Sequence, residues 1–127
     1  ALPSFKLHKF VSEKVVQEQH EYRTGVVYTT NRRIWEHDHD FRAKLRATTS
    51  IGIDMETATI FIVGHYNQIA RGALLLVSDV PITPDSIKTE ESDRLVTRKW
   101  LETHLTIGIN AMTEIGKSGE KIRHFQY

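Results

Sequence analysis

The sequence predicts an α/β fold, because segments patterned like strands alternate with segments patterned like helices along its 127 residues. The continuous apolar run Ala73–Val77 is typical of a strand buried on both faces of a parallel sheet. The segment before it, from Met55 to a break at Arg71-Gly72, is apolar on nearly every helical face. A helix of that kind is usually covered by protein on most sides. The two segments together therefore indicate a sheet with helices packed on it.

The N-terminal part is expected to contain one helix and one strand. Residues 1–10 mix a proline with scattered apolar side chains, which indicates a short extended lead-in. Ser12 is a candidate cap for a helix over Glu13–Glu21, which has few apolar residues and so needs a partner surface. Thr24–Thr30 is rich in β-branched and aromatic residues and predicts a strand.

The middle of the chain adds a surface helix and a second strand. Glu36–Ala47 is charged, and Phe41 and Leu45 are spaced to lie on one face of a helix. Gly52–Asp54 is expected to form a short strand, with Asp54 as a candidate N-cap for the apolar helix that follows.

The C-terminal part is expected to be a loop and one long helix. Val80–Asp85 contains two prolines, which are excluded from helix interiors and central strands. The helix is predicted over Ser92–Thr113, with acidic residues favouring its N-terminus. Its core-facing stripe is expected to be Leu101, Leu105, Ile109 and Met112. Ile115-Gly116 is expected to end the helix and to leave a polar tail over 117–127. The length of the chain predicts a single region over 1–127.

Composition narrows the classes of partner. The chain has 17 basic and 16 acidic residues and a net charge of +1, so no nucleic-acid partner is indicated. It has no cysteine, which excludes disulfides and thiolate sites. No apolar run reaches the length of a membrane span, and the first four residues do not resemble a signal peptide. The expectation is a soluble, cytoplasmic protein without a membrane partner.

Two carboxylates are the leading site candidates from the residues alone. Asp79 lies just past the apolar run, after Ser78, and Glu56 stands in the first turn of the apolar helix. Ligands of open α/β sheets bind beyond the carboxyl ends of the strands. Each carboxylate also has an ordinary structural explanation, since Asp is common in turns and acids favour helix N-termini.

The stretches Ile53–Ala58 and Leu76–Asp79 together resemble the nucleoside phosphorylase and nucleosidase superfamily. Its members pair a Met-Glu that opens a helix under the ribose with a Ser-Asp that ends the next strand beside the base. Gly25–Arg33 and Lys88–Arg94 are most similar to the C-terminal part of bacterial AMP nucleosidases. The resemblance implies part of a three-layer α/β/α fold with a mixed, largely parallel sheet. The superfamily's domain is longer, and its phosphate loops lie in an earlier half, so this chain resembles about half of one active site.

The resemblance also implies a reaction and roles. The reaction is hydrolysis of AMP to adenine and ribose 5-phosphate, or phosphorolysis if orthophosphate replaces water; a subdomain without turnover of its own is the other alternative. Asp79 would act as general acid towards the purine N7, a role that needs a carboxyl with a raised pKa. Glu56 would accept hydrogen bonds from the ribose hydroxyls, and Met55 would contact the sugar. Ser78 would either bond the base or cap the strand end.

The loop after the first strand supplies further candidates. Asn31, Arg32 and Arg33 are substrate-binding candidates, since an Arg can bind a 5′-phosphate bidentately, although a solvated basic turn fits as well. Trp35 could stack on adenine, but packing in the core is the favoured interpretation. Arg94 resembles a family arginine that can swing towards the strand-end Asp and assist proton delivery.

No cofactor and no metal are expected. The run His37–Asp40 alternates His and Asp, but residues two apart on a helix point to different sides and cannot chelate one ion. By resemblance the substrate is AMP or a related purine nucleotide or nucleoside, and the assembly is a homo-oligomer, commonly a hexamer.

Overall fold

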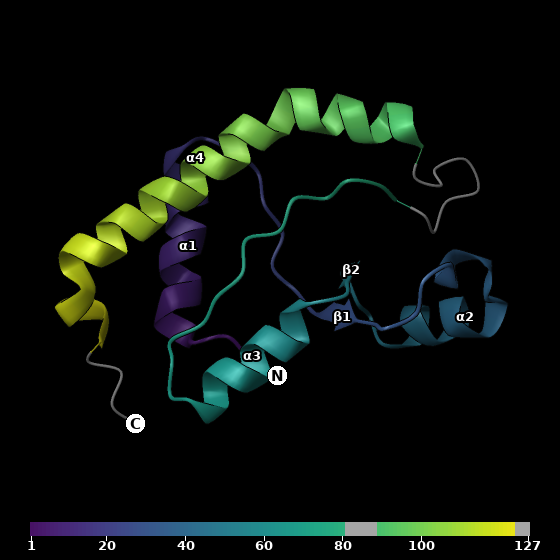
Figure 1. Ribbon diagram of the computed structural model, residues 1–127, viewed down its shortest axis with the longest axis horizontal. Coiled ribbons are helices and arrows are strands. Elements are labelled where there is room, and N and C mark those ends of the chain that lie inside the picture. The colour runs from purple at the N-terminus through teal and green to yellow at the C-terminus, as the bar shows by residue number, and fades with distance from the viewer. Residues whose placement is uncertain (81–88, 124–127) are drawn as a thin grey trace.

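The computed structural model describes residues 1–80 and 89–123. Figure 1 shows the long C-terminal helix α4 running across the molecule beside α1, with α3 and the small sheet below and α2 at one end. The elements in chain order are α1 (Phe5–Gln17), β1 (Val27–Thr29), the 3₁₀ helix η1 (Trp35–His37), α2 (His39–Ala47), β2 (Gly52–Asp54), α3 (Thr57–Tyr66) and α4 (Glu90–Arg123).

The sheet of the described residues consists of β1 and β2, which pair in parallel. Val27 lies opposite Gly52, and Thr29 lies opposite Asp54. Parallel neighbours need a crossover connection, and here η1 and α2 supply it. The predicted α/β class and the parallel pairing are therefore confirmed. The strand β1 is shorter than the predicted Thr24–Thr30, and β2 has its predicted bounds.

The first helix differs from its prediction. It begins at Phe5 and ends at Gln17, so the expected extended lead-in is wrong and Ser12 lies inside the helix. Ser4 occupies the N-cap position, where its backbone N–H donates to the Arg71 carbonyl at 2.8 Å. The chain leaves the helix through Gln19, whose φ of 59° is left-handed. The long-range bond at Ser4 explains why the helix starts earlier than local capping residues indicated.

The helix α2 ends where predicted, at Ala47, but it begins at His39 and not at Glu36. Asp38 occupies the N-cap position and accepts a hydrogen bond of 2.9 Å from the Phe41 backbone N–H. Phe41 and Leu45 are 7% and 2% exposed, which confirms the predicted apolar face. Trp35 lies 6.1 Å from the Phe41 ring between centroids. Packing of Trp35 against a core residue agrees with the favoured interpretation of that side chain.

The helix α3 begins at Thr57 and ends at Tyr66, well before the predicted break at Arg71-Gly72. Just after its end, Gln68 takes a left-handed φ of 57°. Phe61 is buried, but the large apolar residues Ile60, Ile62 and Val63 are exposed. The expectation of a helix covered on most sides is therefore wrong in this structure. The physical reason is that β1 is its main tertiary neighbour among the described elements, which covers only one face.

The apolar run Ala73–Val77 is not a strand. It passes through the molecule as irregular chain, and Val77 is 67% exposed. Strand structure requires a neighbour that accepts and donates the ladder hydrogen bonds. The described sheet contains only β1 and β2, and neither pairs with this run. The apolar pattern thus predicted a buried strand that this chain does not form on its own.

The helix α4 is longer than predicted and buries a different face. It extends over Glu90–Arg123, so Ile115-Gly116 does not end it and residues 117–123 are helical, not tail. The buried residues are Ile107 and Ala111, and α4 packs against α1. Lys14 of α1 and Glu114 of α4 form an ion pair of 2.5 Å between the two helices. The predicted core-facing stripe is exposed: Leu101, Leu105, Ile109 and Met112.

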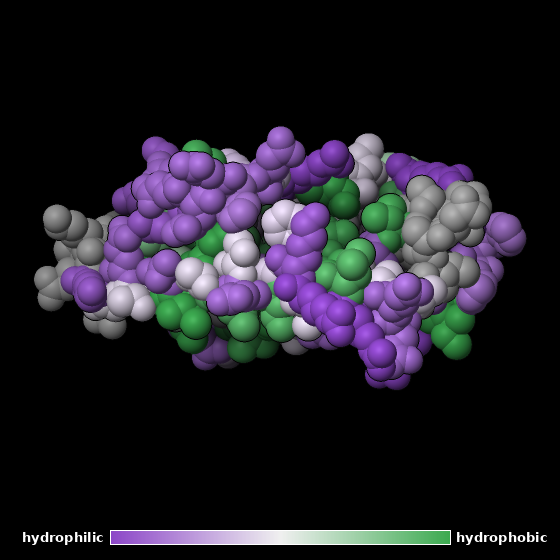
Figure 2. Space-filling model, turned by 90° about the horizontal axis from the view of Figure 1, so that it is seen from above, coloured by the Kyte–Doolittle hydropathy of each residue, from purple (hydrophilic) through white to green (hydrophobic). Residues whose placement is uncertain are grey.

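The two apolar faces of α4 lie on opposite sides of the helix. At 3.6 residues per turn, Leu105 lies about 160° around the axis from Ile107. Apolar surface is also visible between hydrophilic side chains on the face shown in Figure 2.

The loop predicted at Val80–Asp85 lies, from Pro81 onwards, outside the described residues. None of the described helices is both long enough and apolar enough to cross a membrane.

Candidate functional site

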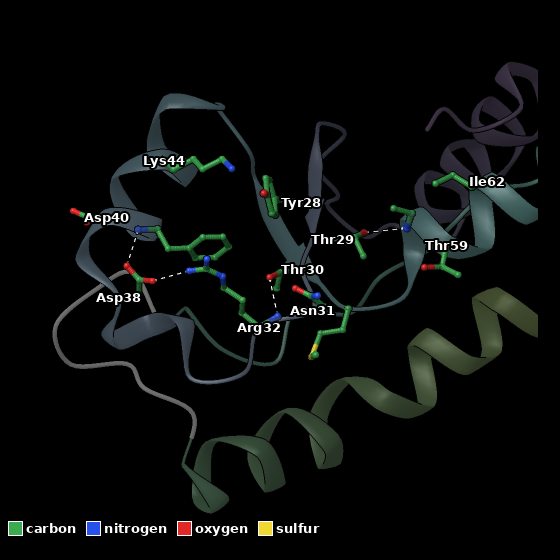
Figure 3. Close-up of a pocket in the computed structure, with 13 residues that line it drawn as sticks. Tyr28, Thr29, Thr30, Asn31, Arg32, Asp38, Asp40, Lys44, Thr59 and Ile62 are labelled. Carbon is green, nitrogen blue, oxygen red and sulfur yellow. Dashed lines mark hydrogen bonds and ion pairs between the residues drawn. The ribbon is translucent and has the colours of Figure 1, made fainter.

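An open pocket of about 800 Å³ lies where β1 ends, between α2 and the start of α3 (Figure 3). Its position at the carboxyl end of a parallel strand is the usual position of ligand sites in α/β sheets. Its volume lies within the range of small-molecule sites, about 300–1,000 Å³. The lining residues come from three segments: Tyr28–Arg32 after and within β1, Asp38, Asp40, Phe41 and Lys44 around α2, and Met55, Ala58, Thr59 and Ile62 around α3.

A network of hydrogen bonds around Asp54, the Asp54 junction, joins the ends of β1 and β2 to the start of α3 beside the pocket. Thr29 donates its hydroxyl to Asp54 Oδ1 at 2.5 Å, which links the last residues of the two strands. Asp54 Oδ2 accepts the Thr57 backbone N–H at 2.7 Å and also the Thr57 hydroxyl. Thr29 Oγ1 in turn accepts the Ala58 backbone N–H at 3.0 Å. Asp54 therefore caps α3, as its sequence position predicted, although Glu56 occupies the N-cap position.

The same bonds determine the protonation of Asp54. Burial acts to raise the pKa of its carboxyl, but hydrogen bonds from the Thr29 and Thr57 side chains and from the backbone N–H groups of Thr57 and Glu56 outweigh it. The net result is a pKa below the ordinary value of 3.8. Asp54 is thus an ionised structural residue that joins β1, β2 and α3, and the sequence pattern indicated only its capping role.

The loop residues Asn31 and Arg32 line the pocket, as expected of substrate-binding candidates. Arg32 is already engaged: its Nη1 donates to Asp38 Oδ2 at 2.8 Å, and its guanidinium lies 5.3 Å from the centre of the Phe41 ring. The Arg32 backbone N–H donates to Thr30 Oγ1 at 3.1 Å. These contacts hold the loop against α2. They also offset the cost of the left-handed φ of 58° at Ile34, which is about 1–3 kcal/mol for such a residue.

The Met-Glu pair lies at the start of α3. Met55 lines the pocket, whereas Glu56 does not. Both residues are exposed, and Glu56 Oε2 accepts the Met55 backbone N–H at 3.1 Å. The Glu56 carboxylate is therefore turned back on its own backbone, close to but not part of the pocket wall.

The remaining candidates lie outside the pocket lining. The Ser78 hydroxyl donates to the carboxylate of Asp79 within the irregular segment that follows Arg71, and both residues are half-buried. Arg94 is exposed on the first turn of α4, where it pairs with Glu90. Arg33 is exposed and is not a lining residue either. The structure thus brings together Asn31, Arg32 and Met55, and leaves the rest apart.

Residues 1–111 match the profile of the phosphorylase superfamily. The chain belongs to this superfamily.

Three named relatives give a finer comparison. AMP nucleosidase of Escherichia coli K12 is 32% identical over 116 residues, which is 90% of this chain and 24% of that protein; the strain O157:H7 protein matches equally. The crystal structure of AMP nucleosidase from Bacteroides thetaiotaomicron superposes with a TM-score of 0.73 at 39% identity, over 94% of this chain and 43% of that one. The predicted resemblance to AMP nucleosidases is confirmed, and the chain spans about a quarter of the length of its curated relatives.

Most residues that line the pocket were not among the site candidates from the sequence, and Tyr28 and Lys44 are two of them. Tyr28 is part of the predicted strand, and its ring meets Phe41 edge-on at 5.7 Å. Lys44 follows Phe41 by three residues, so the predicted helix already placed both on neighbouring positions of one face. This spacing of an aromatic residue and a cation is the signal in the sequence that could have identified Lys44.

The run His37–Asp40 spans the end of η1 and the start of α2, so His37 and Asp38 are not α-helical, although the sequence predicted a helix there. Asp38 serves as the cap of α2 and the partner of Arg32. Across the described part of the chain, no group of three or more His, Asp or Glu residues is arranged to hold a metal ion.

Proposed function

We propose that this chain carries the nucleotide-binding part of an AMP nucleosidase-type site, which hydrolyses the N-glycosidic bond of AMP to adenine and ribose 5-phosphate. The observation that carries the proposal is the pocket at the end of β1, where Met55 and the loop residues Asn31 and Arg32 meet in one cavity. The identities of 32% and 39% to AMP nucleosidases support the choice of substrate.

The proposed chemistry uses the two carboxylates. A water molecule adds to C1′ of the ribose as the bond to the purine N9 breaks, and Asp79 gives the leaving base a proton at N7. Glu56 accepts hydrogen bonds from the ribose hydroxyls, and its charge stabilises the cationic sugar of the transition state. Met55 contacts the sugar, and Ser78 positions Asp79, to which its hydroxyl already donates. The attacking water loses one proton to the solvent as its oxygen bonds to C1′.

The basic residues are proposed to support this arrangement. Asn31 and Arg33 would hold the loop against the nucleotide, and Arg94 would assist proton delivery to Asp79 after it leaves Glu90. That ion pair is exposed, and exposed pairs contribute about 0–1 kcal/mol to stability, so Arg94 can leave Glu90 at little cost. No cofactor is needed for this reaction.

A second possibility is that the chain has no turnover of its own, and one observation favours it. Ser78 and Asp79 do not line the pocket, and the run before them is largely exposed and pairs with neither described strand. Asp79 would reach the substrate once Ala73–Val77 is held as a strand by further protein, either more of the same polypeptide or a neighbouring subunit in a homo-oligomer. Catalysis and assembly are therefore linked in this proposal.

The test is an adenine-release assay with AMP, performed with and without phosphate on material whose intact mass is known. Release without phosphate supports hydrolysis, release that requires phosphate makes the reaction phosphorolysis, and binding of AMP without release supports the non-catalytic alternative.

Asp79→Asn is the decisive variant. General acid catalysis is typically worth about 10²–10⁴-fold, so we expect a loss of that order with AMP binding retained. Glu13→Gln, on the exposed side of α1, is the matched control and should leave the rate unchanged. An Asp79→Asn variant with the full rate would contradict the proposed role.

A further inference from the structure

Arg32, one of the two arginines that the sequence offered for a 5′-phosphate, is already engaged in this structure. Arg32 pairs with Asp38 at 2.8 Å and stacks over Phe41, and Asp38 at the same time caps α2. Drawing Arg32 onto a ligand would leave that carboxylate without its ion-pair partner. A phosphate group entering the pocket would therefore have to compete with a contact that organises the loop and the helix together.

Lys44 is the pocket's other cation, and its surroundings are different. Among the described residues, none of the recorded ion pairs involves Lys44. Its Nζ lies 6.0 Å from the centre of the Tyr28 ring, and Figure 3 shows the side chain directed towards Tyr28. Asp40, one turn earlier on α2, points away from Lys44 in the same view. The ammonium group therefore lies at the pocket with an aromatic face as its neighbour.

The position of Lys44 is set by well-packed residues. It stands between Phe41 and Leu45, which are the most deeply buried residues of α2 and fix the rotation of that helix. A cation–π contact is weaker than a charge-assisted hydrogen bond to an ionised group. The contact with Tyr28 is thus strong enough to orient the ammonium and weak enough to yield it to an anionic ligand.

We infer that Lys44 binds the phosphate monoester of the nucleotide and so determines the preference for a nucleotide over a nucleoside at this pocket. The inference rests on the proposed function for the identity of the nucleotide, but it assigns the phosphate to a residue that the sequence reasoning did not name. Neutral donors also line the cavity, among them the hydroxyls of Tyr28 and Thr59 and the amide of Asn31.

The experiment measures binding, so it does not depend on turnover. Wild-type chain and Lys44→Gln are titrated calorimetrically with AMP, adenosine and ribose 5-phosphate at low and at physiological ionic strength. We expect Lys44→Gln to weaken AMP and ribose 5-phosphate by about 10- to 100-fold, to leave adenosine within about twofold, and to reduce the salt dependence of AMP binding. Lys44→Arg should retain most of the phosphate affinity, because it keeps the charge.

The matched control is Lys99→Gln. Lys99 also lies over an aromatic ring, at 4.9 Å from the centre of Trp100, but on α4 and outside the pocket lining. Its substitution should change none of the three affinities. If the Lys44→Gln variant loses the circular dichroism of the folded chain, the comparison of Lys44→Arg with wild type, with salt as the variable, takes its place.

The outcomes separate the inference from the function on which it rests. Equal weakening of AMP and adenosine, or no weakening of either, overturns the role of Lys44 while leaving the adenine-nucleotide site in place. Binding of ribose 5-phosphate alone, lost in Lys44→Gln, supports the phosphate site and counts against the AMP assignment. If the wild-type chain binds none of the three compounds, both are refuted.

Discussion

The Asp54 junction and the segment Ala73–Asp79 make opposite use of similar sequence signals. Both hold a motif of the superfamily resemblance, Met-Glu beside the junction and Ser-Asp at the end of the segment. At the junction, Asp54 finds Thr29, Thr57 and the start of α3 within hydrogen-bond distance in the same chain. The segment has apolar side chains in solvent and no pairing with the described strands.

The difference teaches where the information for each structure lies. A junction made of caps and side-chain bonds needs only residues about 25 positions apart, all present here. A buried strand needs a sheet neighbour and two covered faces, which its own sequence cannot provide. The exposed faces of α3 and α4 extend the same pattern, since each has one buried and one uncovered apolar side. The Met-Glu half of the candidate site is therefore better organised than the Ser-Asp half.

Of the changes at the two compared regions, Asp54→Ala is expected to have the largest effect on folding. It removes the acceptor of the Thr29 and Thr57 hydroxyls and of the Thr57 N–H, so we expect a loss of about 3 kcal/mol in the free energy of unfolding. Urea denaturation followed by circular dichroism measures it. Glu102→Ala, exposed on α4, should stay within about 0.5 kcal/mol. A loss below about 1 kcal/mol for Asp54→Ala would show that the junction is not what joins these elements.

The pH dependence of stability should come partly from the same carboxyl. Because its pKa is lower in the folded chain than the ordinary 3.8, Asp54 stabilises the fold fully above that pH and loses the contribution as the pH falls through its folded value. Urea midpoints measured from about pH 5 downwards should fall more steeply for wild type than for Asp54→Asn. Parallel pH profiles of the two proteins would mean that the hydrogen bonds do not hold the carboxylate ionised.

The smallest effect is expected from Val77→Asp in the isolated chain. Val77 is mainly in solvent, so its substitution should change the free energy of unfolding by no more than about 0.5 kcal/mol. The control is Val15→Asp on α1, where 4% of the side chain is exposed and burying a carboxylate should cost more than about 3 kcal/mol. If Val77→Asp destabilised as strongly as Val15→Asp, the run would be buried and the contrast between the two regions would fail. Sedimentation on the same samples reports whether an oligomer covers the run.

Local patterns predicted α2 and the cap of α3, because both depend on neighbours within one or two helical turns. The two short strands were also predicted, although their pairing joins residues 25 positions apart. The same reasoning failed for α1, whose start is fixed by Ser4 bonding to Arg71, 67 positions away. It failed again for α4, where two apolar faces competed and the contact with α1 selected Ile107 and Ala111. Long-range partners decided each of these cases.

By itself, the sequence determined the α/β class, the superfamily resemblance and the candidate residues of the site, because spacing and residue chemistry are properties of the chain alone. Only the tertiary structure decided which candidates meet. It joined Met55 with Asn31 and Arg32, committed Arg32 to Asp38, and left Lys44 as the pocket cation without an ion-pair partner among the described residues. The reason is that a pocket is made by side chains from separate elements, and their distances follow from packing, which no single segment encodes.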